Sequence, residues 1–181
     1  VRESTIQFLQ NVLDEVLELF PSQIIHIGGD ECPKVQWKQS AEAQARIKEL
    51  GLKDEDELQS YFVRRMDTYL TERGRRLLGW DEILEGGLAP GAIVMSWRGE
   101  AGGIAAATMG HDVVMAPNTY AYLDYMQSAD TAQEPLGIGG FLPLEKVYSF
   151  EPVPSQIPAD KAHHILGPQG NGFTLGDTSR P

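Results

Sequence analysis

Apolar residues recur at three- and four-residue steps in two long segments of the chain, and this spacing predicts two amphipathic helices. The first is expected over residues 3–20, with one face formed by Ile6, Leu9, Leu13, Val16 and Phe20. The second is expected over about residues 55–73, with an inner face formed by Leu58, Phe62, Met66 and Leu70. A shorter helix is expected over residues 41–50.

Polar residues that favour helix starts stand in front of these segments. Ser4 and Gln7 have the spacing of a capping box at the first helix. Ser40 is the expected cap of the short helix, and Asp54 with Glu57 is expected to cap the second long one. These side chains can satisfy backbone groups that a helix end leaves without partners, so the sequence also predicts where the helices begin.

Short apolar runs between the helices predict buried strands, at residues 23–28, 76–80, 92–97, 112–116 and 164–167. A helix of small residues is expected between the third and fourth runs, over residues 100–109. A long polar loop over residues 118–140 and a short helix over residues 144–150 precede the last run. Strands that alternate with helices indicate a parallel α/β sheet.

Polar or aromatic residues follow each predicted strand, from Asp30 and Glu31 after the first to Gln169 and Asn171 after the last. In a (β/α)8 barrel, the carboxyl ends of all the strands meet at one mouth, which carries the active site. Five strands are fewer than the eight of that fold. The sequence therefore predicts an incomplete TIM-type barrel, the second part of one, forming a single partial catalytic domain over residues 1–181.

Composition and charge narrow the function classes. Of the 181 residues, 41% are hydrophobic and 23% are charged, as in a globular protein. The net charge of −11 and the lack of a Lys/Arg cluster argue against nucleic acid as a partner. No apolar run reaches the length of a membrane span. Cys32 is the one cysteine, and no Cys/His cluster accompanies the acids, so no metal site is expected.

The segment from His26 to Glu31, His-Ile-Gly-Gly-Asp-Glu, carries the strongest chemical signal. It ends in two adjacent carboxylates after two glycines that allow close approach of backbone or ligand. One carboxyl group can stay protonated as a general acid while its neighbour works ionised, which is typical of carbohydrate cleavage. An acidic pair at a helix N-terminus is the alternative. His26 is predicted to be a buried, hydrogen-bonded residue that supports the acids.

Four motifs in this order resemble the family 20 glycoside hydrolases, the β-N-acetylhexosaminidases. They are His26–Glu31, Gly79–Glu82, Ser96–Trp97 and Tyr122–Asp124. Their spacing fits the fourth to seventh strands of that family's barrel, and the resemblance extends to about residue 172. It implies that the chain comprises about strands 4 to 8 of the barrel.

The resemblance implies a retaining, substrate-assisted mechanism, which departs from the usual two-carboxylate scheme. The 2-acetamido oxygen of the sugar attacks the anomeric carbon and forms an oxazolinium ion. Glu31 would protonate the leaving oxygen and then deprotonate the attacking water. Asp30 would accept the acetamido N–H and offset the growing positive charge. Tyr122 would donate its hydroxyl to the acetamido oxygen.

The resemblance also implies a sugar pocket. Trp80 and Trp97 would enclose the N-acetyl methyl group, although both could instead be ordinary core aromatics. Asp124 would bind a sugar hydroxyl. The substrate would be an oligosaccharide or glycoconjugate with a terminal β-linked N-acetylhexosamine, either GlcNAc or GalNAc. The resemblance implies that no metal or organic cofactor takes part. The family implies a periplasmic, secreted or lysosomal location for the parent enzyme.

The C-terminal stretch departs from the family pattern. Phe173 stands where the family has a tryptophan, and Leu175 where it has a glutamate that hydrogen-bonds the sugar. Residues 176–181 match nothing in the family and are expected to be a non-native or disordered tail.

These departures leave two rival hypotheses open. One is an inactive glycan-binding module, and the other is an incomplete structural fragment that self-associates through open barrel edges. A family 18-like chitinase is disfavoured because its motif of alternating acids is absent.

Overall fold

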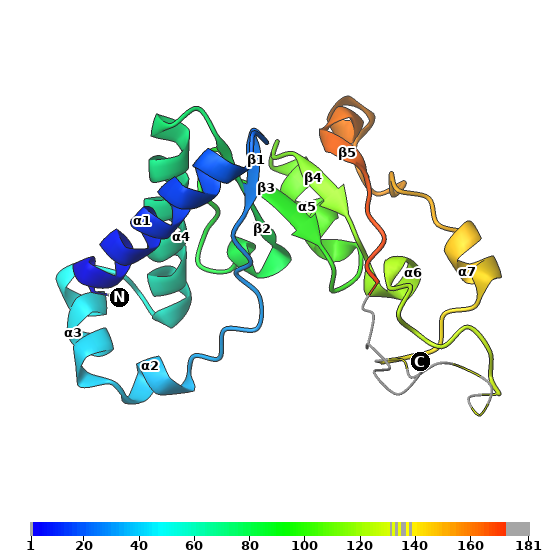
Figure 1. The fold of residues 1–181 in the computed structure, drawn as a ribbon, viewed down its shortest axis with the longest axis horizontal. Coiled ribbons are helices and arrows are strands. Elements are labelled where there is room, and N and C mark those ends of the chain that lie inside the picture. Colours follow the sequence, from blue (N-terminus) through cyan, green and yellow to red (C-terminus); the bar gives the residue numbers. More distant parts are fainter. Residues whose placement is uncertain (1, 131, 133, 135–136, 138, 173–181) are drawn as a thin grey trace. The chain divides into compact units, whose positions relative to one another are not determined.

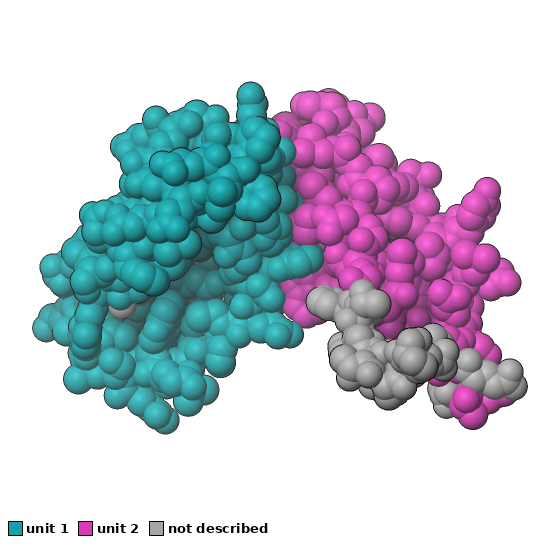
Figure 2. Space-filling model, viewed as in Figure 1, with its two compact units in different colours: residues 1–94 teal, residues 95–181 magenta. Residues whose placement is uncertain are grey.

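A computed structural model describes residues 2–130, 132, 134, 137 and 139–172 of the chain (Figure 1). Its residues form two compact units, residues 1–94 and residues 95–181 (Figure 2). Each unit combines helices with parallel strands, as the alternation of periodic segments predicted. Within the described part of the chain, no helix is both long and apolar enough to cross a membrane.

Unit 1 is built on two parallel strands, β1 (Ile24–His26) and β2 (Arg76–Trp80). Ile24 pairs with Arg76, and His26 pairs with Leu78. Both strands end where the predicted site residues begin. The helices of this unit are α1 (Glu3–Leu19), α2 (Val35–Gln39), α3 (Ala41–Glu49), α4 (Glu55–Glu72) and the 3-10 helix η1 (Asp81–Leu84).

Helix α4 provides much of the core of unit 1. Asp54 caps it as predicted, since its side chain accepts hydrogen bonds from the backbone N–H groups of Asp56 and Glu57 at 3.1 and 3.0 Å. Phe62 of the predicted inner face is only half-buried, whereas Leu58, Met66 and Leu70 are at most 3% exposed, as predicted. Burying these side chains contributes roughly 1.5–3 kcal/mol each.

Helix α3 begins after Ser40, whose hydroxyl accepts a hydrogen bond from the N–H of Ala43 at 3.2 Å, so that predicted cap is confirmed. The helix packs on α4 through a cluster of Ala43, Ile47 and Leu58. Helix α1 is tied to its neighbours by ion pairs from Glu3 to the guanidinium groups of Arg46 and Arg65, at 2.6 and 2.9 Å. These ion pairs connect α1 to both α3 and α4.

Unit 2 contains the parallel strands β4 (Val113–Met115) and β5 (Ile165–Pro168). Strand β3 (Ile93–Ser96) crosses the boundary between the units, and the carbonyl of Ser96 accepts the N–H of Ala116 at 2.9 Å. The helices of this unit are α5 (Ala101–Thr108), α6 (Asn118–Ala121), α7 (Leu144–Tyr148) and the 3-10 helix η3 (Ala159–His164).

Several boundaries differ from the predictions. The capping box at Ser4 and Gln7 is wrong, because α1 already begins at Glu3 and Arg2 precedes it without a side-chain cap. The first strand is shorter than residues 23–28, and the last begins at Ile165 after a 3-10 helix. The predicted loop over residues 118–140 starts with the short helix α6.

Candidate functional site

The acid-bearing loop, residues 28–32, follows β1 directly. The ladder with β2 continues past the strand, since Ile27 N–H donates to the Leu78 carbonyl and Trp80 N–H donates to the Gly28 carbonyl, both at 2.9 Å. The backbone then turns into left-handed conformations, with φ of 76° at Gly28 and 97° at Gly29. Glycine adopts such values without steric cost, so the two glycines of the motif shape this turn.

Asp30 and Glu31 lie in the middle of this loop, and both residues are exposed. Glu31 has a φ of 46° and is the one non-glycine residue with a positive φ in the part of the chain that the structure describes. A residue with a side chain rarely adopts this conformation, and it clusters at functional sites when surrounding contacts hold it. The predicted acid therefore occupies a strained position after a strand, and the helix N-terminal alternative is excluded because no helix begins there.

His26 and Trp80 are brought together at the ends of the paired strands. Their ring centroids lie 5.0 Å apart in an edge-on arrangement. The Nδ1 of His26 accepts the N–H of Gly28 at 3.0 Å, so the predicted hydrogen bonding is present. The prediction that His26 is buried is wrong, because β1 has β2 as its one neighbour in the sheet and leaves this side chain exposed. Partial burial of the ring still lowers the pKa of His26, against a smaller opposing effect of the Asp30 charge.

Unit 2 holds the other predicted site residues on two adjoining segments. Trp97 follows β3, and its carbonyl accepts the N–H of Asn118 at the start of α6, at 2.8 Å. Tyr122 follows α6, and its ring stacks on that of Trp97 with centroids 6.2 Å apart. Both residues are half-buried, so neither belongs to the fully buried core.

Asp124 is positioned by the same segment of unit 2. Hydrogen bonds between Leu123 N–H and the Asn171 carbonyl, at 2.6 Å, and between Asn171 N–H and the Ala121 carbonyl, at 2.7 Å, hold the chain there. The Oδ1 atom of Asp124 is buried without a hydrogen-bond partner among the described residues. A buried carboxylate oxygen of this kind is costly unless a ligand or another group satisfies it, which fits the predicted contact to a sugar hydroxyl.

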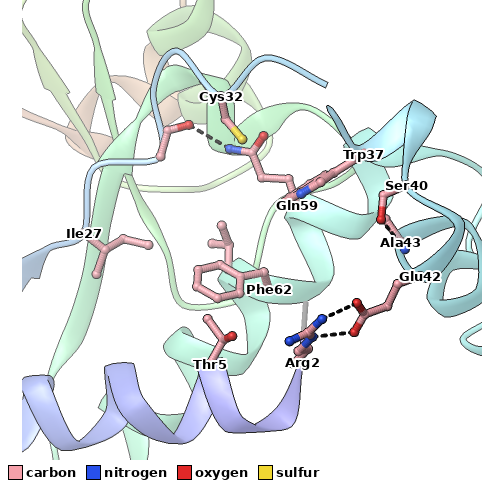
Figure 3. Close-up of a pocket in the computed structure, with 12 residues that line it drawn as sticks. Arg2, Thr5, Ile27, Cys32, Trp37, Ser40, Glu42, Ala43, Gln59 and Phe62 are labelled. Carbon is pink, nitrogen blue, oxygen red and sulfur yellow. Dashed lines mark hydrogen bonds and ion pairs between the residues drawn. The ribbon is translucent and has the colours of Figure 1, made fainter. Parts of the chain in front are cut away.

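A cavity of about 510 Å³ lies in unit 1 beside the acid-bearing loop (Figure 3). Gly29, Cys32 and Gln59 belong to its lining, whereas Asp30 and Glu31 do not. The cavity is therefore separate from the predicted sugar-cleaving acids. Gln59 of the lining was not among the predicted site residues. One glutamine on an amphipathic helix carries no distinguishing signal in the sequence.

Phe173 and Leu175, which depart from the family pattern, and the tail of residues 176–181 lie outside the described residues. The described site residues form two sets, and each set lies within one unit. In unit 1 the set is His26, Asp30, Glu31 and Trp80; in unit 2 it is Trp97, Tyr122 and Asp124.

Comparison with known proteins identifies relatives along most of the chain. A beta-hexosaminidase from Porphyromonas gingivalis is 55% identical over 171 residues, which cover 94% of this chain and 22% of that protein. A beta-hexosaminidase from Vibrio furnissii is 39% identical, over 91% of this chain and 27% of that protein. The chain thus spans about a quarter of the length of these relatives.

Solved structures of related enzymes share the fold of this chain. The exo beta-N-acetylglucosaminidase of glycoside hydrolase family 20 from Vibrio harveyi, in complex with N-acetylglucosamine, is 37% identical with a TM-score of 0.80, over 92% of this chain and 26% of that one. A beta-N-acetylhexosaminidase from Bacteroides fragilis has a TM-score of 0.79 at 28% identity, over 95% and 35%.

These solved relatives are TIM barrels, and the predicted fold class is confirmed: this α/β chain corresponds to part of such a barrel. The family model for the catalytic domain of glycosyl hydrolase family 20 matches residues 1–174. The chain belongs to glycosyl hydrolase family 20.

Proposed function

We propose that this chain supplies the acid-bearing part of a β-N-acetylhexosaminidase that removes terminal β-linked GlcNAc or GalNAc from oligosaccharides or glycoconjugates. The observation that carries the proposal is the loop after β1, which presents two adjacent exposed carboxylates with Glu31 in a left-handed conformation. The names of the relatives from Porphyromonas gingivalis and Vibrio furnissii support the same activity.

The proposed reaction proceeds in two steps. In the first, the 2-acetamido oxygen bonds to the anomeric carbon, the glycosidic bond breaks, and Glu31 gives its proton to the leaving oxygen. In the second, water attacks the anomeric carbon and gives a proton back to Glu31, while the oxazolinium ring opens to the acetamide. Asp30 stays ionised, accepts the acetamido N–H and stabilises the positive charge.

The remaining residues take the roles that the family resemblance implies. Trp80 and Trp97 enclose the N-acetyl methyl group. Tyr122 donates its hydroxyl to the acetamido oxygen and thereby orients it for attack. Asp124 binds a sugar hydroxyl, which the orphaned Oδ1 atom supports.

The test measures release of 4-nitrophenol from its N-acetyl-β-D-glucosaminide. Two proteins are needed, because the chain spans about a quarter of its relatives. One is the chain alone. The other, called the graft below, is the Porphyromonas gingivalis relative with this chain in place of its matching segment. We expect the graft to be active and its Glu31→Gln variant to lose activity by roughly 100-fold or more, since the second step needs Glu31 as a base.

Glu15, exposed on α1, provides the matched control. Glu15→Gln removes the same charge and should leave turnover unchanged. Near-normal turnover by Glu31→Gln would show that the acid is wrongly assigned. Retention of configuration at the anomeric carbon, followed by NMR, and tight binding of an oxazoline-mimicking inhibitor would support the substrate-assisted mechanism. An inverted product would exclude it.

A second candidate is an inactive module that at most binds N-acetylated sugars. The exposure of Asp30 and Glu31 and the limited share of the relatives that the chain covers favour it for the chain alone. Binding of N-acetylglucosamine by the chain without turnover, together with an active graft, would establish this role for the isolated chain.

A further inference from the structure

We propose that Lys34 and Gln59 form a clamp that positions Glu31 for proton transfer. The clamp holds the backbone of the acid-bearing loop on both sides of the two acids. It rests on the proposed function, since its purpose is the placement of the general acid. Neither residue is expected to touch the sugar, so both are positioning residues.

Gln59 holds the N-terminal side of the loop. It lies on α4, and only 6% of its surface is exposed. Its amide nitrogen donates to the carbonyl of Gly29 at 2.7 Å, as Figure 3 shows, and its amide oxygen accepts a hydrogen bond from the ammonium of Lys34. Because a primary amide offers a donor and an acceptor, glutamine can satisfy both partners at once.

Lys34 holds the C-terminal side. Its ammonium donates to the carbonyl of Cys32 at 2.8 Å as well as to Gln59. The carboxylate of Asp56 lies 3.7 Å away, and the ring centre of Trp37 lies 5.9 Å away. With its side chain 15% exposed, this ammonium is largely removed from water, and these partners compensate for that desolvation.

The clamp binds the backbone on both sides of Glu31, the strained residue. Gly29 and Cys32, the two residues whose carbonyls it binds, flank Asp30 and Glu31 in the sequence. A left-handed conformation at a residue with a side chain, such as Glu31, is unfavourable and persists only where neighbouring contacts enforce it. No hydrogen bond joins either acid's carboxylate to another described residue, so the held backbone sets where these side chains project.

The expected defect is specific to proton donation. Gln59→Met and Lys34→Met keep similar volumes and remove the hydrogen bonds. In the graft, each should lower kcat/KM for the disaccharide N,N′-diacetylchitobiose by roughly 10- to 100-fold, because a misplaced acid protonates a poor leaving group badly. The same variants should lower kcat/KM for the 2,4-dinitrophenyl glycoside by about threefold at most, because that leaving group needs little protonation.

Gln39→Met is the matched control, because Gln39 is exposed at the end of α2. It should leave kcat/KM unchanged for both substrates. If Glu31→Gln abolishes activity while the two clamp variants match the control, the clamp is overturned and the proposed function stands. An equal loss on both substrates would also overturn the clamp, since it would reflect general destabilisation. An inactive graft, or an active Glu31→Gln variant, would instead overturn the proposed function.

A second measurement tests the clamp without activity. Hydrogen exchange followed by mass spectrometry on the chain itself should show faster exchange in peptides covering residues 27–34 of Gln59→Met and Lys34→Met. Peptides from α1 and α3 should exchange at the unmodified rate, which also verifies that the variants fold. Unchanged exchange over residues 27–34 would overturn the clamp whatever the graft does.

Discussion

A side chain at Gly29 would be strained and would crowd Ile83. The φ of Gly29 is 97°, and a Cβ atom there would lie 2.7 Å from the Cγ2 atom of Ile83 in η1. We predict that Gly29→Ala lowers the free energy of unfolding by roughly 2–3 kcal/mol, from backbone strain plus the clash. Gly51→Ala is the control, because Gly51 has a φ of 66° with open space around it and should lose only about 1–2 kcal/mol. Equal losses in urea unfolding would refute a role for Ile83.

His26 makes stability depend on pH. Partial burial of the ring holds its folded pKa below the ordinary value of about 6.5, and its Nδ1 must be unprotonated to accept the Gly28 N–H. The unfolded chain therefore binds the proton more tightly, so stability is complete above pH 6.5 and falls as the pH drops through the folded pKa. The unfolding free energy should decrease between pH 7.5 and 5.5, and His26→Gln should make that decrease smaller. An identical pH profile in the variant would contradict this prediction.

Residue chemistry was predictable where the local sequence determines it. The order of strand, two glycines and two acids is sufficient to place Asp30 and Glu31 on a turn after β1. The contact of Gln59 with Gly29 joins residues 30 positions apart, and no local pattern encodes it. The exposure of His26 escaped prediction for a related reason, since burial depends on what covers a strand face and not on the strand's own residues.

At the scale of elements, the packing of α3 on α4 depends on Leu58, which has no exposed surface. Leu58→Ala should lower the unfolding free energy by roughly 2–5 kcal/mol, because a cavity remains after the side chain is removed. Leu19→Ala is the control, since Leu19 is 75% exposed at the end of α1. This substitution should lower the unfolding free energy by less than about 0.5 kcal/mol. Urea unfolding followed by circular dichroism checks both, and a small loss at Leu58 would mean that α3 packs loosely.

Element length decides which elements can be read from the sequence. Helix α4 and strand β2 have well-defined caps or apolar runs, and their predicted bounds agree with the structure. Helices α2 and η1 have five and four residues, which is too short for a periodic pattern to appear. The capping box predicted at Ser4 fails for a tertiary reason. Glu3 forms ion pairs with Arg46 and Arg65 from the first turn of α1, so the helix begins before Ser4.

At the scale of the molecule, the chain exposes apolar surface that the fold does not cover. Phe8 is 63% exposed and Phe20 is 57% exposed, on and just after α1, and β1 has β2 as its one strand neighbour in the described sheet. Open strand edges and apolar faces promote association between chains. The barrel relatives are about four times as long, so this surface is one that further chain could cover in a protein of their size.

We therefore predict that the chain alone self-associates in a concentration-dependent manner. Sedimentation velocity across a range of concentrations should show a rising average mass, because apolar surface removed from water contributes about 25 cal/mol per Å². The double variant Phe8→Ser, Phe20→Ser should shift this rise to higher concentration. Tyr148→Ser is the control, because Tyr148 is 91% exposed but belongs to unit 2 and not to α1 or β1, and should leave the association unchanged. A monodisperse monomer at every concentration would show that the exposed face and edge of unit 1 are tolerated in water.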